Sequence, residues 1–256
     1  IRTNSIYEFP YIKGGFGEYM YVFPGTFCWQ VPEEMPSRIA ALLDPMAVAM
    51  RSVELAMRAP GIFEDSFHLG STVLVIGDGQ IAVLVATIAR TLGVQHIILS
   101  GFSDQKLKLA QEISGADEIM NSAKLSIDQR RAIITKYNHK NGADVVFQCA
   151  GSPYAFRDGV DLLKNVGTMI ETGNIVGSKT IQFDPARDLC SKHATYIGMS
   201  VNTAATFNKA FQMLCKYEKL GLERIFTHRA TLDTLGATMA QGKDPNYMKG
   251  WLDFSR

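Results

Sequence analysis

A glycine-rich turn between an apolar run and an amphipathic segment is the feature that most constrains the fold of this chain. Residues 71–76 form a short apolar run, typical of a strand buried on both faces. The turn Gly77-Asp78-Gly79-Gln80-Ile81-Ala82 follows and opens a segment over 80–92 with helical apolar spacing. The first glycine permits a tight bend, the second lets a pyrophosphate approach the backbone, and Ala82 lets the helix pack on the strand. The sequence therefore predicts a dinucleotide-binding turn that includes Gly77, Gly79, Gln80 and Ile81, with a purely structural turn as the alternative.

Strand-like and helix-like segments alternate after this turn. Short apolar runs predict strands, and longer segments with a period near 3.6 predict the helices between them. This alternation predicts a parallel sheet with helices on both faces, in the doubly wound (Rossmann) α/β arrangement. The predicted strands cover 71–76, 96–99, 118–120, 143–148, 167–172 and 194–199, and the predicted helices cover 80–92, 104–113, 126–137 and 154–163.

The two ends of the chain have other patterns. Residues 18–23 and 27–31 predict two short strands, and residues 59–70 are typical of a linker. Ser37 is a candidate cap for a helix over 36–58 that Pro45 interrupts. Methionines at 46, 50 and 57 predict a packing stripe on that helix. After residue 200 we expect a helix over 204–217, a strand over 224–227, a helix over 232–240 and a strand over 247–254.

Composition excludes several classes of protein. Of the 256 residues, 46% are hydrophobic and 20% are charged, which excludes disorder as the main state. The net charge of +1 gives no basic face, so we expect no nucleic-acid partner. The apolar runs are shorter than a membrane span requires, so we expect no membrane association. Four cysteines without a zinc or disulfide spacing predict reduced thiols in a cytoplasmic protein.

The end of the second predicted strand bears on the choice of cofactor. In a dinucleotide-binding fold, an acidic residue here hydrogen-bonds the adenosine ribose. The best-placed position is Gly101, and Asp104 comes three residues later. Without the acid, a 2′-phosphate is not repelled, and Ser100, Ser103 and Lys106 are candidates to face it. The cofactor is therefore NAD or NADP, with a lean to NADP, while a simple helix-capping role for Ser103 stays open.

Small residues follow two further strands. The fourth strand is followed by Cys149-Ala150-Gly151, and the fifth by Gly173-Asn174. Ligands in open α/β sheets bind beyond the carboxyl ends of the strands. These residues therefore leave room for a nicotinamide ribose and ring, although turn formation alone also explains the glycines.

Together these segments resemble the medium-chain dehydrogenase/reductase superfamily, and in particular its zinc-dependent alcohol and polyol dehydrogenases. The resemblance implies residues 1–57 as the end of a β-rich, GroES-like catalytic domain with a crossing helix, 58–202 as the dinucleotide-binding domain, and 203–256 as a returning segment. The matching stretches are 14–19 (Gly-Gly-Phe-Gly-Glu-Tyr), 42–49 (Leu-Leu-Asp-Pro-Met-Ala-Val-Ala), 73–82, 142–147, 149–152 and 227–229 (Thr-His-Arg).

The resemblance also implies roles for two residues and for a segment ahead of Ile1. Lys249 falls where the family places a basic residue near the pyrophosphate, although a solvated lysine is the alternative. Asp44 falls where some members supply an acidic zinc ligand or a carboxylate beside the metal, and helix capping is its alternative. The zinc-binding cysteine, the Gly-His-Glu element and the structural zinc lobe would precede Ile1. The chain is therefore expected to lack the amino-terminal part of the catalytic domain.

The implied reaction is hydride transfer between an alcohol or polyol and NAD(P), assisted by zinc in the full-length protein. A small-molecule alcohol or ketone is the expected substrate, and a homodimer or homotetramer the expected assembly. The five histidines are scattered, so no general base is named and the catalytic residues stay unassigned. Two alternatives remain open: a zinc-free, NADPH-dependent reductase of quinones or enones, and a non-catalytic dinucleotide-binding or scaffold protein.

Overall fold

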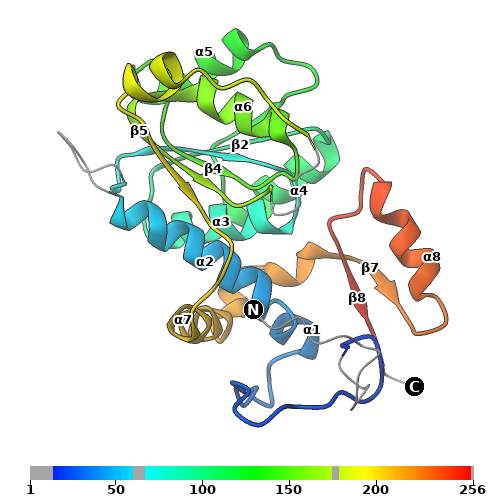
Figure 1. Cartoon of the computed structure of the whole chain (residues 1–256). Helices are drawn as coiled ribbons and strands as arrows, with labels where there is room; N and C mark the ends of the chain where they lie inside the picture. Colours follow the sequence, from blue (N-terminus) through cyan, green and yellow to red (C-terminus); the bar gives the residue numbers. More distant parts are fainter. Residues whose placement is uncertain (1–13, 60–66, 175–178, 255–256) are drawn as a thin grey trace.

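The chain folds around a six-stranded parallel sheet (Figure 1). The computed structural model describes residues 14–59, 67–174 and 179–254. The strand order is β3-β2-β1-β4-β5-β6, so the chain reverses direction across the sheet between β3 and β4. The predicted doubly wound α/β fold is confirmed. The strands are β1 (Thr72–Ile76), β2 (His96–Gly101), β3 (Glu118–Asn121), β4 (Ala143–Gln148), β5 (Leu163–Glu171) and β6 (Thr195–Gly198).

Alternate side chains of each central strand enter two separate cores. Val73 and Val75 of β1 point into the core beneath α2, α3 and α4, whereas Leu74 and Ile76 point into the core beneath α5 and α6. Figure 1 shows α2 and α3 on one side of the sheet and α5 and α6 on the other. These helices are α2 (Leu43–Arg58), α3 (Gln80–Thr91), α4 (Asp104–Ser114), α5 (Ile127–Asn138) and α6 (Pro153–Leu162).

Fixed local signals set several helix ends. Ser126 and Gln129 form a reciprocal capping box at the start of α5. Ser103 accepts a hydrogen bond from the Lys106 N–H at the start of α4, which satisfies one unpaired helical donor. Gly115 ends α4 in the left-handed conformation that glycine adopts without strain. The sequence therefore encodes these boundaries locally.

The helices that lead into the sheet differ from the prediction. The break falls at residues 41–42, between α1 (Ser37–Ala40) and α2, and Pro45 lies inside the first turn of α2, where its missing N–H is tolerated. Ser37 caps nothing, because Pro36 holds the cap position. Met46 is fully buried, but Met57 is 57% exposed in the last turn, so the predicted methionine stripe does not extend to it.

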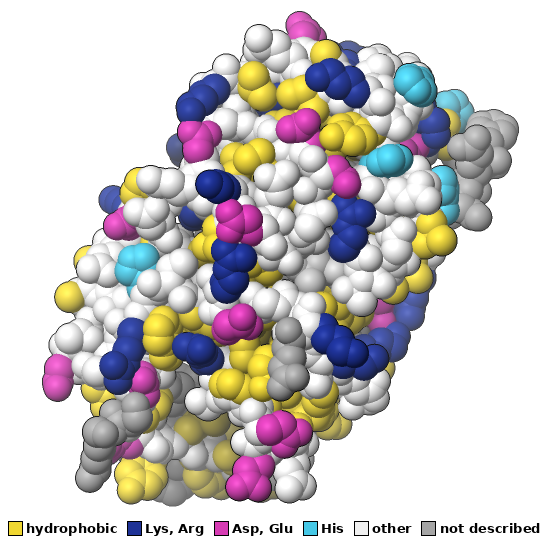
Figure 2. Space-filling model, turned by 180° about the vertical axis from the view of Figure 1, so that it is seen from behind, with side chains coloured by type: hydrophobic (Ala, Val, Ile, Leu, Met, Phe, Trp, Pro, Cys, Tyr) yellow, Lys and Arg dark blue, Asp and Glu magenta, His cyan; other side chains and the backbone are white. Residues whose placement is uncertain are grey.

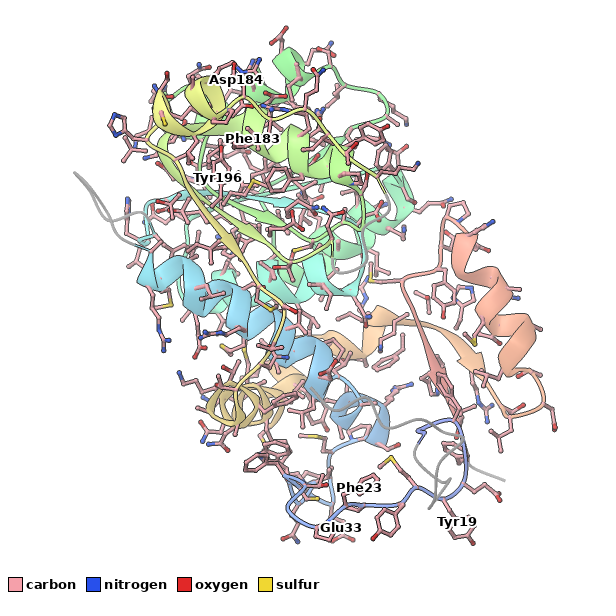
Figure 3. The ribbon with its side chains drawn as sticks, in the orientation of Figure 1. Tyr19, Phe23, Glu33, Phe183, Asp184 and Tyr196 are labelled. Atoms are coloured by element: carbon pink, nitrogen blue, oxygen red, sulfur yellow. The ribbon has the colours of Figure 1, made fainter. Side chains whose placement is uncertain are left out.

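Residues 14–35 contain no strand, so the two strands predicted at 18–23 and 27–31 are wrong. Their aromatic side chains are largely solvent-exposed, and no strand among the described residues pairs with them. Two short apolar segments without a further strand to pair with cannot form a stable sheet by themselves. Figure 3 shows Tyr19, Phe23 and Glu33 of this segment at the end of the molecule remote from Tyr196. Most of the predicted linker, at 60–66, lies outside the described residues.

The returning segment begins with α7 (Ala204–Leu214), which packs against α2. It ends in a separate two-stranded parallel sheet of β7 (Phe226–Ala230) and β8 (Lys249–Leu252), joined through α8 (Leu235–Ala240). Short single turns complete the chain: the π-helical η1 (Pro185–Cys190) and the 3₁₀ turns η2 (Tyr217–Lys219), η3 (Leu222–Ile225) and η4 (Gln241–Lys243).

The face drawn in Figure 2 carries basic and acidic side chains interspersed with one another. All four cysteines are free thiols, and three of them are exposed rather than packed as small hydrophobic groups. Within the described ranges, we find no helix whose length and apolar character would let it cross a membrane.

Candidate functional site

The glycine-rich turn lies at the carboxyl edge of the sheet, where the strand order reverses. β1 has β2 on one side and β4 on the other. The Gly77 N–H donates to the Ser100 carbonyl at 2.7 Å, and the Cys149 N–H donates to the Ile76 carbonyl at 2.8 Å. The turn is thereby held to both neighbouring strand ends. Open α/β sheets bind ligands at such a reversal.

A cavity of about 300 Å³ opens at this point. The structure brings six of the predicted cofactor-binding residues to its wall, together with residues that the sequence did not single out. Phe102 and Tyr154 stand in the wall and are 67% and 63% exposed, so both aromatic rings are available to a flat ligand. The predicted residues in the wall are Gly77, Gly79, Gly101, Cys149, Ala150 and Gly151.

Glycine is required at two positions of the turn for different physical reasons. Gly77 has φ +139°, and an added Cβ would lie 3.3 Å from the Cys149 carbonyl carbon and 3.4 Å from the Ala82 Cβ. Gly79 precedes the first turn of α3, and an added Cβ there would meet nothing within 4 Å. Gly77 is thus needed by the protein itself, whereas the space over Gly79 is free. Gln80 and Ile81 begin α3, whose first N–H groups face that space.

Asp78, between the two glycines, folds over the end of β2. Its Oδ2 accepts hydrogen bonds from the N–H groups of Phe102 and Ser103, both at 2.9 Å. Its Oδ1 lies 2.9 Å from the Lys106 Nζ. Burial raises the pKa of Asp78, but these hydrogen bonds and the lysine outweigh it, so the pKa lies below its ordinary value. Asp78 is therefore a carboxylate at neutral pH.

The same carboxylate explains Gly101. A Cβ at position 101 would lie 2.7 Å from the Asp78 Cβ and 3.0 Å from its Cγ and Oδ2, which is too close for any larger residue. From the sequence alone, Gly101 is the position of a missing acid that leaves room for a 2′-phosphate. In the structure a carboxylate from the glycine-rich turn already lies against that position.

The three residues expected to face a 2′-phosphate are otherwise engaged or buried. Lys106 pairs with Asp78, and Ser103 both caps α4 and donates from its hydroxyl to the Pro245 carbonyl at 2.9 Å. Ser100 is fully buried, and its Oγ has no hydrogen-bond partner among the described residues. Ser100 nevertheless lines the cavity, so its hydroxyl is an unused polar group beside it.

A second cavity, of about 210 Å³, lies at the ends of β5 and β6. Asn174, a predicted site residue, lines it together with Glu171 and Thr172. The Glu171 Oε1 accepts from the Asn174 N–H at 2.8 Å, while its Oε2 is buried with no partner among the described residues. Burial raises the pKa of Glu171, and hydrogen bonds from Asn174, Gly173 and Gln148 only partly oppose it.

The glycine at the end of β5 is enforced by packing. A Cβ on Gly173 would lie 2.2 Å from the Ala150 carbonyl oxygen, so the ends of β4 and β5 touch backbone to backbone. An added Cβ on Gly151 would come no closer than 3.7 Å to the Gly173 carbonyl oxygen. Burial and Glu171 raise the pKa of the Cys149 thiol, which is therefore protonated at neutral pH and has no nucleophilic character.

The described residues do not form a zinc site. No group of three histidine, cysteine, aspartate or glutamate side chains is close enough within them to hold a metal ion. Asp44 is exposed in the first turn of α2, where a carboxylate also suits the helix dipole. Lys249 on β8 lies outside both cavity walls, and burial lowers its pKa while Asp44 opposes that shift. Neither residue lines the cavity at the glycine-rich turn.

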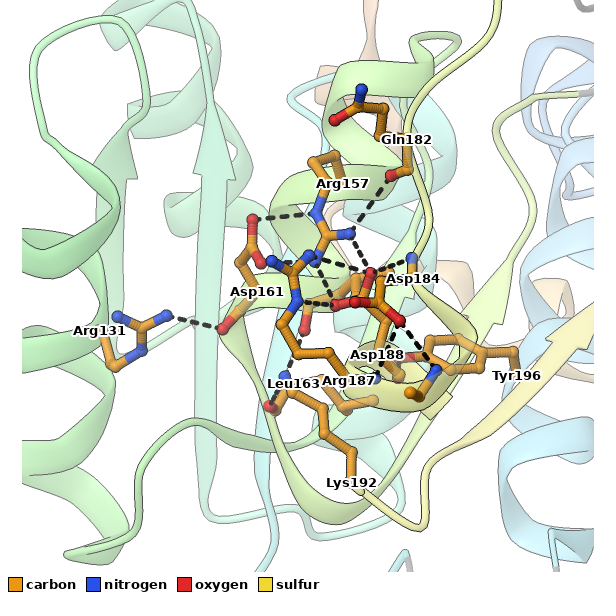
Figure 4. A network of polar contacts seen from close by, with 12 residues as sticks. Arg131, Arg157, Asp161, Leu163, Gln182, Asp184, Arg187, Asp188, Lys192 and Tyr196 are labelled. Atoms are coloured by element: carbon orange, nitrogen blue, oxygen red, sulfur yellow. Dashed lines mark hydrogen bonds and ion pairs between the residues drawn. The ribbon is translucent and has the colours of Figure 1, made fainter. Parts of the chain in front are cut away.

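A further polar cluster joins α6, η1 and the start of β5 (Figure 4). Arg157 pairs with Asp188 at 2.6 Å and with Asp161 at 2.5 Å, and Arg187 pairs with Asp188 at 2.7 Å. Lys192 donates to the carbonyls of Val160 in α6 and of Leu163, the first residue of β5. Because these groups satisfy one another, the cluster ties η1 to α6 and β5 and is no candidate site.

Sequence reasoning missed Asp78, Glu171 and the two aromatic residues of the wall. Asp78 occupies a variable position of the glycine motif, where the motif itself carries no information. A negatively charged residue is nevertheless unusual in a turn expected to bind phosphates, and the sequence shows one there. Glu171 was similarly visible as an acid in an otherwise apolar strand end, Gly167-Thr168-Met169-Ile170-Glu171.

Comparison with known proteins gives consistent results. A family model described as zinc-binding dehydrogenase matches residues 80–216, slightly more than half of the chain. D-xylulose reductase from Saccharomyces cerevisiae is 28% identical over 79% of this chain and 53% of its own length. L-threonine 3-dehydrogenase from Xanthomonas campestris is 27% identical over 94% of this chain and 66% of its own length.

Solved structures that resemble this chain are also those of dehydrogenases. An alcohol dehydrogenase from Thermotoga maritima superposes with a TM-score of 0.86 and 26% identity, covering 97% of this chain and 66% of that one. L-idonate 5-dehydrogenase from Escherichia coli has the same fold, with a TM-score of 0.78 at 24% identity. The chain thus spans between about half and two thirds of the length of these proteins.

Proposed function

We propose that this chain, which belongs to the zinc-binding dehydrogenase family, forms the nicotinamide-dinucleotide-binding part of an oxidoreductase that acts on an alcohol or polyol. The observation that carries this proposal is the free space over Gly79 at the start of α3, which opens into the cavity between β1, β2 and β4. Helix N-terminal N–H groups and an unobstructed glycine are what a pyrophosphate requires.

A nicotinamide dinucleotide, when bound, supplies the hydride acceptor or donor for alcohol–carbonyl interconversion. The residues of this chain bind and orient it. Gly77, Gly79, Gln80 and Ile81 would hold the pyrophosphate, and Gly101, Ser103 and Lys106 would border the adenosine ribose. The nicotinamide half would be bordered by Cys149, Ala150 and Gly151, which line the first cavity, and by Gly173 and Asn174, of which Asn174 lines the second. Lys249 would need to move toward the pyrophosphate to contribute.

Replacing Gly79 by arginine tests the proposal. Because a side chain at position 79 projects into free space, Gly79→Arg should fold normally while blocking the approach of the pyrophosphate. We expect the affinity for NADH, measured by quenching of protein fluorescence, to fall at least about tenfold, equivalent to 1.4 kcal/mol. Gly79→Ala is the matched control, and its loss should be smaller.

Unchanged NADH affinity in Gly79→Arg, with an unchanged melting temperature, would show that the cofactor does not bind at this turn. Failure of the unaltered chain to bind either NADH or NADPH would remove the whole proposal. A non-catalytic dinucleotide-binding protein would have the same cofactor site. The oxidoreductase is distinguished from it by turnover of an alcohol, measured with a protein as long as the relatives.

We also propose that zinc assists the hydride transfer in the full-length protein, and that Asp44 lies near the metal rather than being its sole ligand. Family membership supports it. No step is assigned to zinc on the described residues, because they do not group enough ligands. Metal analysis distinguishes this from the zinc-free reductase, since only the zinc-assisted enzyme would retain stoichiometric zinc after dialysis.

We also propose the division into 1–57, 58–202 and 203–256, a cytoplasmic location, and assembly into a homodimer or homotetramer. The two separate sheets support the first, since β7 and β8 pair with each other and not with the six-stranded sheet. Free thiols support the second. The edge position of β6 supports the third, because the unpaired backbone groups of an edge strand can pair with a second chain. A monomeric mass in sedimentation velocity would exclude the proposed assembly.

A further inference from the structure

The adenosine end of the candidate site has a carboxylate where the sequence shows none. We propose that Asp78, held by Lys106 and by the end of β2, hydrogen-bonds the adenosine ribose and makes the chain selective for NAD(H) over NADP(H). This inference rests on the proposed function, because it concerns which dinucleotide the same site accepts. It reverses the lean to NADP that the absence of an acid at Gly101 suggested.

The first step is that Asp78 retains one free acceptor site. A carboxylate has about four lone-pair sites on its two oxygens. The Phe102 and Ser103 N–H groups occupy the two on Oδ2, and Lys106 takes one on Oδ1. One acceptor on Oδ1 therefore remains at the cavity wall, of which Asp78 is a part. A ribose hydroxyl can donate to it, whereas a 2′-phosphate has no proton to donate above its second pKa of about 6.

The second step is that Asp78 is placed where a ribose-binding acid is needed. Its Oδ2 bonds the two N–H groups that directly follow Gly101, the last residue of β2. An acid at the end of this strand is the usual partner of the ribose hydroxyls. Here the acid reaches the same place from the neighbouring turn, and the contact between its Cβ and Gly101 excludes a side chain at 101.

A third, independent observation points to a polar ligand at this end. Ser100 is fully buried and lines the cavity, yet its Oγ has no hydrogen-bond partner among the described residues. Buried hydroxyls in folded proteins are normally hydrogen-bonded. A ribose bound at Asp78 would bring its hydroxyls to the part of the wall to which Ser100 belongs.

The charge balance then decides the selectivity. Lys106 is neutralised by Asp78, and Ser103 donates to Pro245, so neither is free to receive a dianionic 2′-phosphate. A phosphate beside Oδ1 would meet a like charge on the partly buried Asp78 side chain, and such a contact is unfavourable. The geometry thus discriminates against NADP(H) by repulsion as well as favouring NAD(H) by a hydrogen bond.

The test is a fluorescence titration of the whole chain with NADH and with NADPH. We expect the unaltered chain to bind NADH at least about tenfold more tightly than NADPH, the ratio expected from one charge-assisted hydrogen bond. Asp78→Asn should weaken NADH binding by about tenfold and leave NADPH binding unchanged or stronger, because the like charge is gone. Asp104→Asn removes a nearby exposed acid on α4 and should leave the ratio unchanged.

A second variant protects the test against misfolding of Asp78→Asn. In Asp78→Gly/Gly101→Asp the atoms that obstruct position 101 are removed, and the acid moves to the strand end. The inference expects this variant to recover the preference for NADH. Equal or tighter binding of NADPH by the unaltered chain overturns it, as does equal weakening of both nucleotides in Asp78→Asn without recovery in the double variant. Binding of neither nucleotide by the unaltered chain instead overturns the proposed function, and the selectivity inference falls with it.

Discussion

Glu171 has a carboxylate of which only one oxygen is used. Its Oε1 receives hydrogen bonds from Asn174 and Gln148, whereas its Oε2 is buried without a partner among the described residues. Burial raises the pKa of the Glu171 carboxyl above its ordinary value. A raised folded-state pKa means that ionisation at neutral pH opposes folding. The opposition is present above the folded pKa and disappears as the pH falls below the unfolded value.

We therefore expect Glu171→Gln to be more stable than the unaltered chain at pH 7.5. The amide keeps an oxygen for the Asn174 N–H and replaces the unpartnered oxygen with a neutral group. Near pH 4, around the ordinary glutamate pKa of about 4.3, the difference should shrink toward zero. Thermal unfolding at both pH values measures it. Exposed Glu33→Gln should show no such pH dependence, and an equal effect of Glu171→Gln at both pH values would contradict the explanation.

At the scale of elements, Asp144 ties three strands together. Its Oδ2 accepts from the Thr72 N–H of β1 at 2.8 Å, and its Oδ1 pairs with Lys164 of β5 at 2.5 Å. The Asp144 side chain is 3% exposed. Burial raises the pKa of Asp144, but Lys164 and the Thr72 N–H outweigh it and lower the pKa below its ordinary value. The carboxylate thus fixes the amino ends of β1, β4 and β5 in register.

Asp144→Ala should lower the free energy of unfolding by about 3 kcal/mol, because it leaves a half-buried lysine and a strand N–H without their acceptor. Urea unfolding at neutral pH measures this change. Asp128→Ala is the matched control, since its pair with Arg131 is exposed and contributes less than about 1 kcal/mol. A loss no greater than that of the control would mean that Asp144 is not a structural tie.

Prediction from sequence succeeded where an element is determined by its own residues. The strands of the sheet are short apolar runs buried on both faces, and the caps at Ser103 and Ser126 follow local rules. Prediction failed where the conformation of a segment depends on residues outside it. Residues 18–23 form an aromatic and apolar run typical of a strand but have no described neighbour with which to pair. The helix break was predicted at Pro45 but falls at 41–42, because the proline ring disfavours a helical bond to the carbonyl four residues earlier.

The site shows the same division. The glycine-rich turn and the small residues after β4 could be predicted, because a bend and a close approach each require a particular residue type. The ribose end could not, because Asp78 lies 24 residues from the Phe102 N–H that it accepts from. The spacing rule of the glycine motif locates the end of the next strand, but it does not indicate that a side chain of the turn folds over that end.

At the scale of the whole molecule, the two ends of the chain meet around α2. Glu54 of α2 accepts from Thr206 at 3.0 Å and pairs with Lys209 on α7. The Tyr217 hydroxyl donates to the Glu34 carbonyl at 3.1 Å. Further along, Arg224 pairs with Glu112 of α4. The returning segment is therefore anchored to α2, to the residues just before α1 and to the dinucleotide-binding part.

The hydrogen bond from Ser103 to Pro245 has a consequence for exchange with solvent. It joins the cap of α4 to a loop 142 positions later in the chain. A nucleotide that orders the adenosine end should therefore slow deuterium uptake by the backbone amides of 244 and 246–248, although none of them lines the cavity. Ser103→Ala should uncouple that loop, while the amides of α5 serve as an internal reference. Mass spectrometry of peptides from the loop, with and without NADH, would then detect occupancy at a distance from the ligand, and identical uptake in both states would mean that the bond transmits nothing.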